Sequence, residues 1–274
     1  MINFIQHTIN SLKKKMDVFI ICHDQDIIRT IEQEKRFSSL PCYTYLFVGN
    51  RPTDKIEHLS NLIVCRRLKH NIEQHKNLVS FTAWYAVSKN KLAKNKYLAL
   101  LEYDSILSDD FYSVTKNVLT STTFAGFLRA YLFSEQFLEI ASTGEHNLKK
   151  TLSNDPDYPV FNIYYLDAVP IVETLLMSIY GINLKDTLVD NFLLTEDPFW
   201  CPVSNAALPV KVLNTFVDWY LPIALACPEE PLIAHVHERC LKVFSVLKNY
   251  SQVFVPNVLT HQQLKSHKIE ALIL

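Results

Sequence analysis

The sequence predicts an α/β fold: a single domain with a mostly parallel central sheet and helices on both faces. Three observations predict it. Short apolar runs alternate with segments of helical spacing along the N-terminal part of the chain. The run at 17–22 is continuously apolar after Asp17, and so is the run at 97–101, which is typical of strands buried on both faces. Finally, the 274 residues are 49% hydrophobic, enough for one sizeable core, and no linker-like stretch divides them.

The first half of the chain, about 17–120, shows the alternation most clearly. The run DVFIIC at 17–22 predicts a central strand, and Asp24 is a good N-cap for an amphipathic helix over 24–36. Further strands are predicted at 43–48, 62–65 and 97–101, with a turn at 49–52 and a helix at 75–90. This order favours a parallel sheet, because each helix can carry the chain back to the start of the next strand.

The second half, about 121–248, is less regular. We expect a strand at 122–127 and helices at 169–180, 211–224 and 231–248, the first of these ending at Gly181. The polar, turn-rich segment 145–160 predicts a loop near a site. Residues 249–274 are interpreted as a C-terminal tail, so that 1–274 form one domain with two unequal halves.

Composition excludes several classes of function. The chain has 27 basic and 28 acidic residues, and this balance gives no global field for nucleic acid, so no nucleic-acid partner is expected. Its 4 glycines cannot form a glycine-rich phosphate loop, so a bound nucleotide would be held by side chains and ordinary turns. No G-x-S-x-G motif is present to anchor a hydrolase triad.

The cysteines and the first residues bear on location. The 6 cysteines include no C-x-x-C pair and are interpreted as reduced, mostly buried thiols, which indicates a cytoplasmic protein. The opening residues lack the apolar core of a secretory signal. Apolar residues there have roughly helical spacing and precede Lys13–Lys15, which favours a capping helix. Peripheral contact with the cytosolic face of a membrane is the open alternative.

Two carboxylates are the main candidate site. Glu102 and Asp104 follow the predicted strand at 97–101, and ligands of open α/β sheets bind at the carboxyl ends of the strands. If the strand continues, residues two apart point to the same side, so both carboxylates would face one place. Such oxygen ligands suit Mn²⁺ or Mg²⁺, with a diphosphate completing the coordination. A chance acidic pair or a helix N-cap is the alternative.

The stretch YLALLEYDSIL resembles the D-x-D segment of glycosyltransferases with the A-type fold (GT-A), with Glu102 in place of the first Asp. Five other segments are similar to the same group, particularly to its polysaccharide-synthesis transferases, and they occur in the same order. These are Cys22-His23-Asp24, FTAWYAVSKN at 81–90, PVSNAA at 202–207, FVDWY at 216–220 and AHVHER at 234–239. Together they span about 17–248.

The resemblance implies a nucleotide-diphospho-sugar donor and a glycan, glycolipid or protein acceptor. It implies that Cys22, His23 and Asp24 hold the base and ribose. Asp104 would face the metal or the diphosphate, and Glu102 the ribose or the metal. Two further donor-binding candidates are Tyr103, which lies between the acids, and Arg66, which follows a short strand on the ligand edge.

Three later residues complete the set of candidates. Glu196 and Asp197 resemble the acidic motif that supplies the catalytic base in inverting members of the group, although Asp-Pro is also ordinary turn chemistry. His235 is the candidate third metal ligand, with a structural histidine as the alternative. It cannot share an ion with His237, because positions two apart on a helix lie roughly 200° apart.

Two other functions stay open at this point. The first is a non-catalytic binding or assembly protein on the same fold. The second is a nucleotidyltransferase that uses the same carboxylates.

Overall fold

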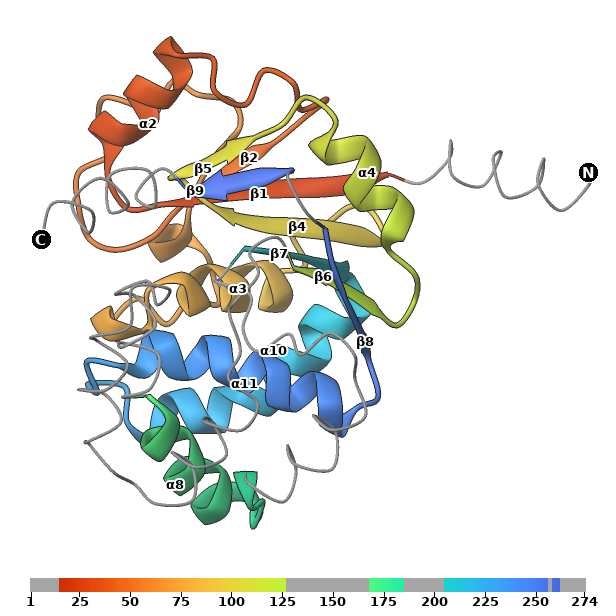
Figure 1. Ribbon diagram of the computed structural model, residues 1–274. Coiled ribbons are helices and arrows are strands. Elements are labelled where there is room, and N and C mark those ends of the chain that lie inside the picture. Colours follow the sequence, from red (N-terminus) through yellow and green to blue (C-terminus); the bar gives the residue numbers. More distant parts are fainter. Residues whose placement is uncertain (1–14, 127–167, 185–204, 256–257, 262–274) are drawn as a thin grey trace, which may run out of the picture.

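A seven-stranded sheet with the strand order β3-β2-β1-β4-β7-β6-β8 forms the centre of the described structure (Figure 1). The structure is a computed structural model that describes residues 15–126, 168–184, 205–255 and 258–261. The elements of the first half are β1 (Met16–Cys22), α2 (Gln25–Gln33), β2 (Thr44–Phe47), β3 (Leu62–Val64), α3 (Ser80–Lys89) and β4 (Tyr97–Glu102). All strands and helices predicted in this half are present.

The helix predicted at 75–90 begins five residues later than expected, at Ser80. Residues Lys76–Leu78 form a 3₁₀ turn, and Val79 between the two has a φ of 42°. A β-branched residue rarely adopts this left-handed conformation, and it interrupts the helical backbone. The spacing of apolar residues could not reveal this break, because the apolar pattern continues across Val79.

The elements after β4 are β5 (Ser105–Leu107), α4 (Phe111–Val118), β6 (Thr123–Gly126), α8 (Val169–Tyr180), β7 (Ala206–Pro209), α10 (Val210–Ala226), α11 (Ile233–Leu247), β8 (Ser251–Phe254) and β9 (Leu259–His261). The predicted strand at 122–127 and the three predicted helices are confirmed. Gly181 ends α8 in the left-handed conformation with a φ of 65°, as expected of a C-cap glycine. Short elements not predicted are α4, β5, β7, β8 and β9, and the last two lie in segment 249–274.

The sheet is mostly parallel, as predicted. β1 pairs in parallel with both β2 and β4, and β2 with β3. β7 is the reversed strand of this sheet, since it pairs antiparallel with β4 and with β6. β6 and β8 are again parallel, and β5 and β9 form a separate antiparallel pair.

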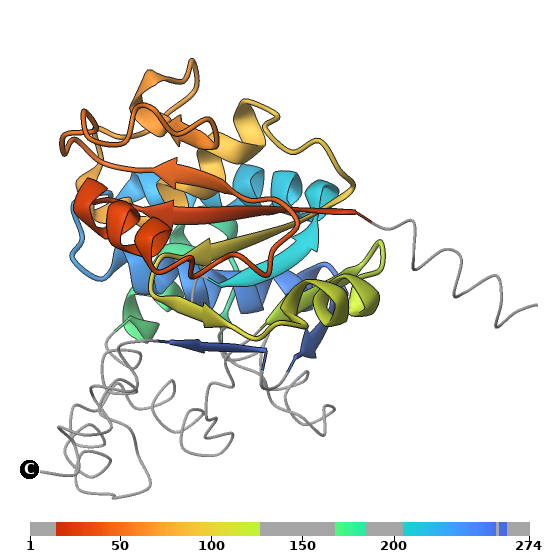
Figure 2. The ribbon, with the colours of Figure 1, turned by 90° about the horizontal axis from the view of Figure 1, so that it is seen from above.

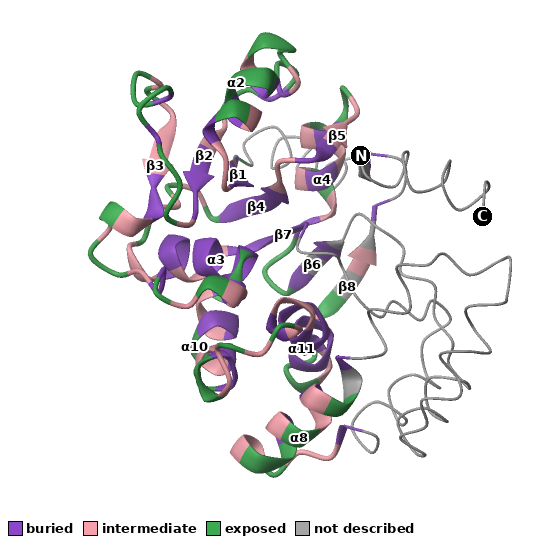
Figure 3. Ribbon diagram, turned by 90° about the vertical axis from the view of Figure 1, so that its left-hand side faces the viewer, coloured by how far each residue is buried: buried purple, intermediate pink, exposed green. Residues whose placement is uncertain are grey.

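Helices cover both faces of the sheet, as predicted. Figure 1 shows α2 and α4 on one side and α3, α10, α11 and α8 on the other. Seen from above, the sheet lies in front of α10 and α11 (Figure 2). Alternate residues of the central strands enter two cores, because successive side chains of a strand point to opposite faces. Phe19, Ile21, Leu98 and Leu100 join the core under α3 and α10, whereas Val18, Ile20, Ala99 and Leu101 join the core under α2. β1 and β4 are therefore buried along nearly their whole length (Figure 3).

No helix within the described ranges has the length and hydrophobicity of a membrane span. The candidate capping or membrane-surface helix lies in residues 1–14, outside the described residues, as does the predicted loop at 145–160.

An aromatic cluster between the helices encloses His237. Its ring centroid lies 5.3 Å from that of Phe81, 4.9 Å from Trp84, 5.5 Å from Phe216 and 5.3 Å from Tyr220. Burial lowers the pKa of His237 to about 4, and the adjacent Glu238 carboxylate opposes this shift only in part. The imidazole is therefore neutral in the folded protein at neutral pH.

This burial predicts a pH-dependent stability. As the pH falls below about 6.5, His237 of the unfolded chain takes up a proton before that of the folded chain, whose pKa is about 4. The free energy of unfolding should therefore fall between these two pH values, by up to about 3 kcal/mol from this residue. His237→Leu should reduce the slope, as measured by urea unfolding at several pH values. His70→Gln, at an exposed position, is the control, and an equal slope in wild type and His237→Leu would contradict the assignment.

Candidate functional site

The candidate site lies where the connections from neighbouring strands diverge. From β1 the chain continues to β2 and β3 on one side, whereas β4 and the later strands lie on the other side. The carboxyl ends of strands at such a point form the usual ligand crevice of an open α/β sheet. Ile21 of β1 pairs with Glu102 of β4, and the Tyr103 amide donates a hydrogen bond to the Ile21 carbonyl at 3.0 Å. The fold thus brings segments 22–24 and 102–104 side by side.

Cys22 and His23 occupy the end of β1. The Cys22 side chain is buried in the core under α2, and burial raises the pKa of its thiol to about 11. His23 is half-buried, and its ring lies edge-on to that of Tyr103, with centroids 5.2 Å apart. Burial, followed by the charge of Arg51, lowers the pKa of His23. At this strand end His23 offers a neutral ring, while the Cys22 thiol is directed into the core.

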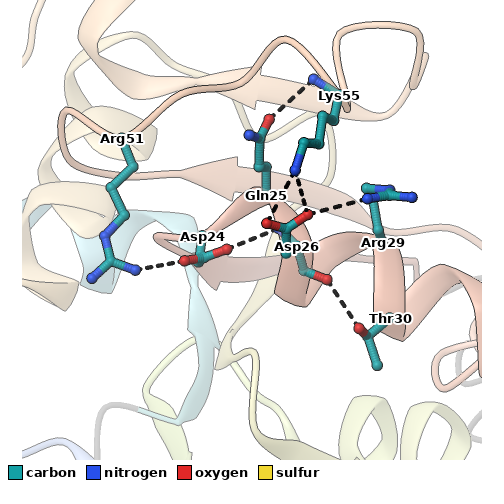
Figure 4. A network of polar contacts seen from close by, with 7 residues as sticks. All are labelled: Asp24, Gln25, Asp26, Arg29, Thr30, Arg51 and Lys55. Atoms are coloured by element: carbon teal, nitrogen blue, oxygen red, sulfur yellow. Dashed lines mark hydrogen bonds and ion pairs between the residues drawn. The ribbon is translucent and has the colours of Figure 1, made fainter.

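The two carboxylate oxygens of Asp24 have different hydrogen-bond partners (Figure 4). Oδ1 accepts a hydrogen bond from the Asp26 amide at 2.8 Å, which confirms the predicted N-cap of α2. Oδ2 forms an ion pair with Arg51 at 2.6 Å. The hydrogen bond from the Asp26 amide lowers the pKa of Asp24, and the contact with Arg51 lowers it further. A charged carboxylate is therefore fixed at the edge of the crevice.

Glu102 is the last residue of β4, and the chain turns immediately after it. Its carboxylate accepts a hydrogen bond from the Ser80 hydroxyl at the start of α3, at 2.7 Å. Asp104 is 5% exposed. Because residues 103–104 form a turn, the strand does not continue through Asp104. The two-residue alternation considered for Glu102 and Asp104 therefore does not apply, and a turn orients the second acid.

Asn205 holds this turn from a distant part of the chain. Its Oδ1 accepts hydrogen bonds from the Glu102 amide at 2.6 Å and from the Ser105 hydroxyl at 3.2 Å. Asn205 is 1% exposed and immediately precedes β7. One buried oxygen thus fixes both ends of the segment that contains Tyr103 and Asp104. Asn205 is not among the predicted site residues, although it lies in the segment 202–207.

Tyr103 lies in the turn after β4, beside α2. Burial, and next the charge of Asp104, raises the pKa of its hydroxyl. The Tyr103 carbonyl accepts a hydrogen bond from Arg36 at 3.2 Å. Beside it lies a surface hollow of about 470 Å³, lined by Asp24, Asp26, Ile27, Thr30, Glu34, Arg36 and Tyr103. Of the predicted donor-binding residues, Asp24 and Tyr103 thus share one hollow.

Arg66 contacts the loop that follows β2. Its guanidinium donates to the carbonyls of Gly49 at 2.8 Å and Arg51 at 3.0 Å, and to the Thr53 hydroxyl at 3.3 Å. These contacts hold the loop that presents Arg51 to Asp24. Arg66 was predicted to bind the donor. In the structure its guanidinium donates hydrogen bonds to this loop. Arg51 itself was missed, although its place in the turn after a strand was a usable signal.

The remaining candidates are His235, which belongs to α11, and Glu196 and Asp197, which lie outside the described residues. His235 is near the start of α11, where its Nδ1 lies 3.3 Å from Glu238 Oε2. That same oxygen accepts a hydrogen bond from Arg239 at 2.6 Å. Within the described ranges, no group of three or more His, Cys, Asp or Glu side chains is placed to hold a metal ion.

Comparisons with known proteins give little beyond this geometry. No family model and no curated protein matches the sequence. Among solved structures, the chain is similar to the apo structure of WbbM, a bifunctional glycosyltransferase, with 12% sequence identity and a TM-score of 0.49. The match covers 90% of this chain and 45% of the WbbM chain, so the chain spans less than half the length of that protein.

The position of Asn205 leads to a prediction about stability. Asn205→Ala should lower the free energy of unfolding by about 2–3 kcal/mol, because the Glu102 amide and the Ser105 hydroxyl both lose their acceptor. Ser105→Ala removes one of these two bonds and should cost about 1 kcal/mol. Urea unfolding of the two variants measures the difference. A smaller effect of Asn205→Ala than of Ser105→Ala would show that Asn205 does not hold the turn.

Proposed function

We propose that the protein is a glycosyltransferase that moves a sugar from a nucleotide-diphosphate donor to a glycan, glycolipid or protein acceptor. The observation that carries the proposal is the juxtaposition of segments 22–24 and 102–104 at the point where the strand connections diverge. A crevice in this position is the usual ligand site of open α/β sheets. Both segments also belong to the set that resembles glycosyltransferases of the A-type fold.

The proposed donor would lie across the two strand ends. The charged carboxylate of Asp24 is a suitable acceptor for ribose hydroxyls. The rings of His23 and Tyr103 offer apolar surface beside the strand ends for a base. Glu102 and Asp104 would then lie toward the diphosphate. In this orientation each predicted donor-binding residue faces a part of the donor, with two exceptions. Cys22 contributes packing, and Arg66 supports the neighbouring loop.

We include a divalent cation, Mn²⁺ or Mg²⁺, in the proposal. Carboxylate oxygens such as those of Glu102 and Asp104 are suitable ligands, and the cation would neutralise charge on the departing diphosphate. One Glu102 oxygen already accepts a hydrogen bond from Ser80. Among the described residues, no third His, Cys, Asp or Glu side chain joins these two in a group that could hold the ion. Donor phosphates and water would supply further ligands. His235 remains a predicted ligand that the described contacts do not support.

In the proposed reaction, the bond between the sugar C1 and the diphosphate oxygen breaks, and the acceptor oxygen bonds to C1. The acceptor hydroxyl loses its proton, which requires a base if the configuration is inverted. Glu196 and Asp197 are the candidates from the sequence. The nucleoside diphosphate leaves with the electron pair of the broken bond.

The first test is a thermal-shift screen of UDP, GDP, CMP and dTDP, each with Mn²⁺, Mg²⁺ or EDTA. Binding to the native state adds RT ln(1 + [L]/Kd), about 2.7 kcal/mol at a hundredfold excess over Kd. We expect one base to raise Tm, and a loss of this shift in EDTA would support the cation. Asp104→Asn should reduce the shift, whereas Asp109→Asn, at an exposed position nearby, should retain it.

Other outcomes of the screen would point to the alternative functions. No shift with any nucleotide would contradict the proposal and favour a non-catalytic binding role. Cleavage of a nucleoside triphosphate, without turnover of any nucleotide sugar, would favour a nucleotidyltransferase. A shift that is indifferent to EDTA would keep the donor site and remove the cation from Glu102 and Asp104.

A further inference from the structure

We propose that Arg51 binds the diphosphate of the donor and leaves Asp24 when the ligand arrives. The inference rests on the proposed function and adds a residue that neither the motifs nor the resemblance identified. It concerns loop 49–55, which follows β2 and lies beside the end of β1. Three properties of this loop carry it: a backbone fixed on both sides, an exposed guanidinium, and the negative charge of the surrounding strand ends.

The first part of the loop is fixed to the β3 side of the sheet. Gly49 has a φ of 83°, a conformation that glycine adopts readily. Its amide donates a hydrogen bond to Glu73 Oε2 at 2.6 Å, and its carbonyl accepts from Arg66 at 2.8 Å. Arg66 also binds the carbonyl of Arg51 at 3.0 Å. The backbone of Arg51 is therefore held directly.

The second part of the loop is fixed to the start of α2 (Figure 4). The Lys55 amide donates to Gln25 Oε1 at 3.0 Å, and Lys55 Nζ pairs with Asp26 at 3.1 Å. Between these two anchored ends, the side chain of Arg51 is 59% exposed. The loop therefore presents an exposed guanidinium from a fixed backbone, so that little backbone entropy is lost when the side chain binds a ligand.

The charges near the crevice require a cation if a diphosphate is to bind. Asp24, Glu102 and Asp104 are all acidic, and each would repel an anion unless a cation lies between them. The Arg51 charge contributes to the pKa of both His23 and Tyr103, after the larger effect of burial in each case. Its electrostatic field therefore extends over the ends of both β1 and β4.

The present partner of Arg51 can be exchanged without loss of structure. An exposed ion pair such as Arg51–Asp24 contributes little, because water screens both charges. A diphosphate carries more charge and accepts two parallel hydrogen bonds from a guanidinium, which a single Asp24 oxygen does not. Asp24 keeps its Oδ1 bond to the Asp26 amide after the exchange, so the cap of α2 remains. Its Oδ2 then becomes available to a ligand hydroxyl.

The test compares diphosphates with their nucleosides in wild type, Arg51→Gln and Arg29→Gln. Calorimetric titration with UDP, GDP and dTDP and with uridine, guanosine and thymidine gives the affinities. For the base that binds, Arg51→Gln should weaken the diphosphate about tenfold or more and leave the nucleoside within about twofold. Arg29→Gln is the matched control, because Arg29 belongs to the same network and pairs with Asp26. It should bind like wild type.

The outcomes separate this inference from the proposed function. If wild type binds none of these ligands, both fail. If wild type binds a diphosphate and Arg51→Gln binds it equally well, the inference is wrong and the proposed function stands. Equal weakening of diphosphate and nucleoside would also overturn it, since Arg51 would then act on the base or ribose. Arg51→Lys, which retains the charge without the fork, should lie between wild type and Arg51→Gln.

Discussion

The parallel pairing of β1 with β4 is the interaction on which the rest of the structure depends. It runs from Met16 opposite Tyr97 to Ile21 opposite Glu102 and joins segments that lie far apart in the chain. The two strands are buried on both faces, so each supplies side chains to both cores. A shift of one residue would exchange the two faces and place polar groups of the site against a core. The same register therefore determines both the packing of the two cores and the position of Asp24 beside the segment that contains Tyr103 and Asp104.

The candidate site begins where this double burial ends. Where β1 and β4 run between two layers of helices, apolar residues occupy nearly every position. Beyond Cys22 and Glu102 the constraint disappears, and His23, Asp24 and Asp104 follow. The turn that carries Asp104 is fixed by Asn205, which lies just before the reversed strand β7. Because β7 runs antiparallel to β4, the residue that precedes it lies at the carboxyl end of β4. The reversed strand thus contributes directly to the site.

Side chains take the place of a glycine-rich phosphate loop. The chain has only 4 glycines, and the loop after β2 is fixed instead by Arg66, Glu73 and Lys55. Such a loop has most of its polar groups committed to internal bonds, so its ligand contacts must come from an exposed side chain. In this loop the exposed charged side chain beside the strand ends is that of Arg51. Arg66, although suitably charged for a phosphate, donates its hydrogen bonds to backbone carbonyls.

The sequence by itself determined the strands and helices that carry the sheet, the N-cap at Asp24, the C-cap at Gly181 and the two segments of the candidate site. Each of these depends on local periodicity or on a residue type at a helix end, which are visible within a few positions. Only the tertiary structure decided the late start of α3, the reversal of β7, the turn at Asp104 and the contacts of Asn205, Arg51 and Arg66. The physical reason is that their hydrogen bonds and ion pairs join distant segments: Asn205 and Glu102 lie 103 positions apart, and Arg51 and Asp24 lie 27 apart. No local pattern encodes such a contact, because it exists only once the strands that carry the two residues have paired: β1 with β2 for Asp24 and Arg51, and β4 with β7 for Glu102 and Asn205.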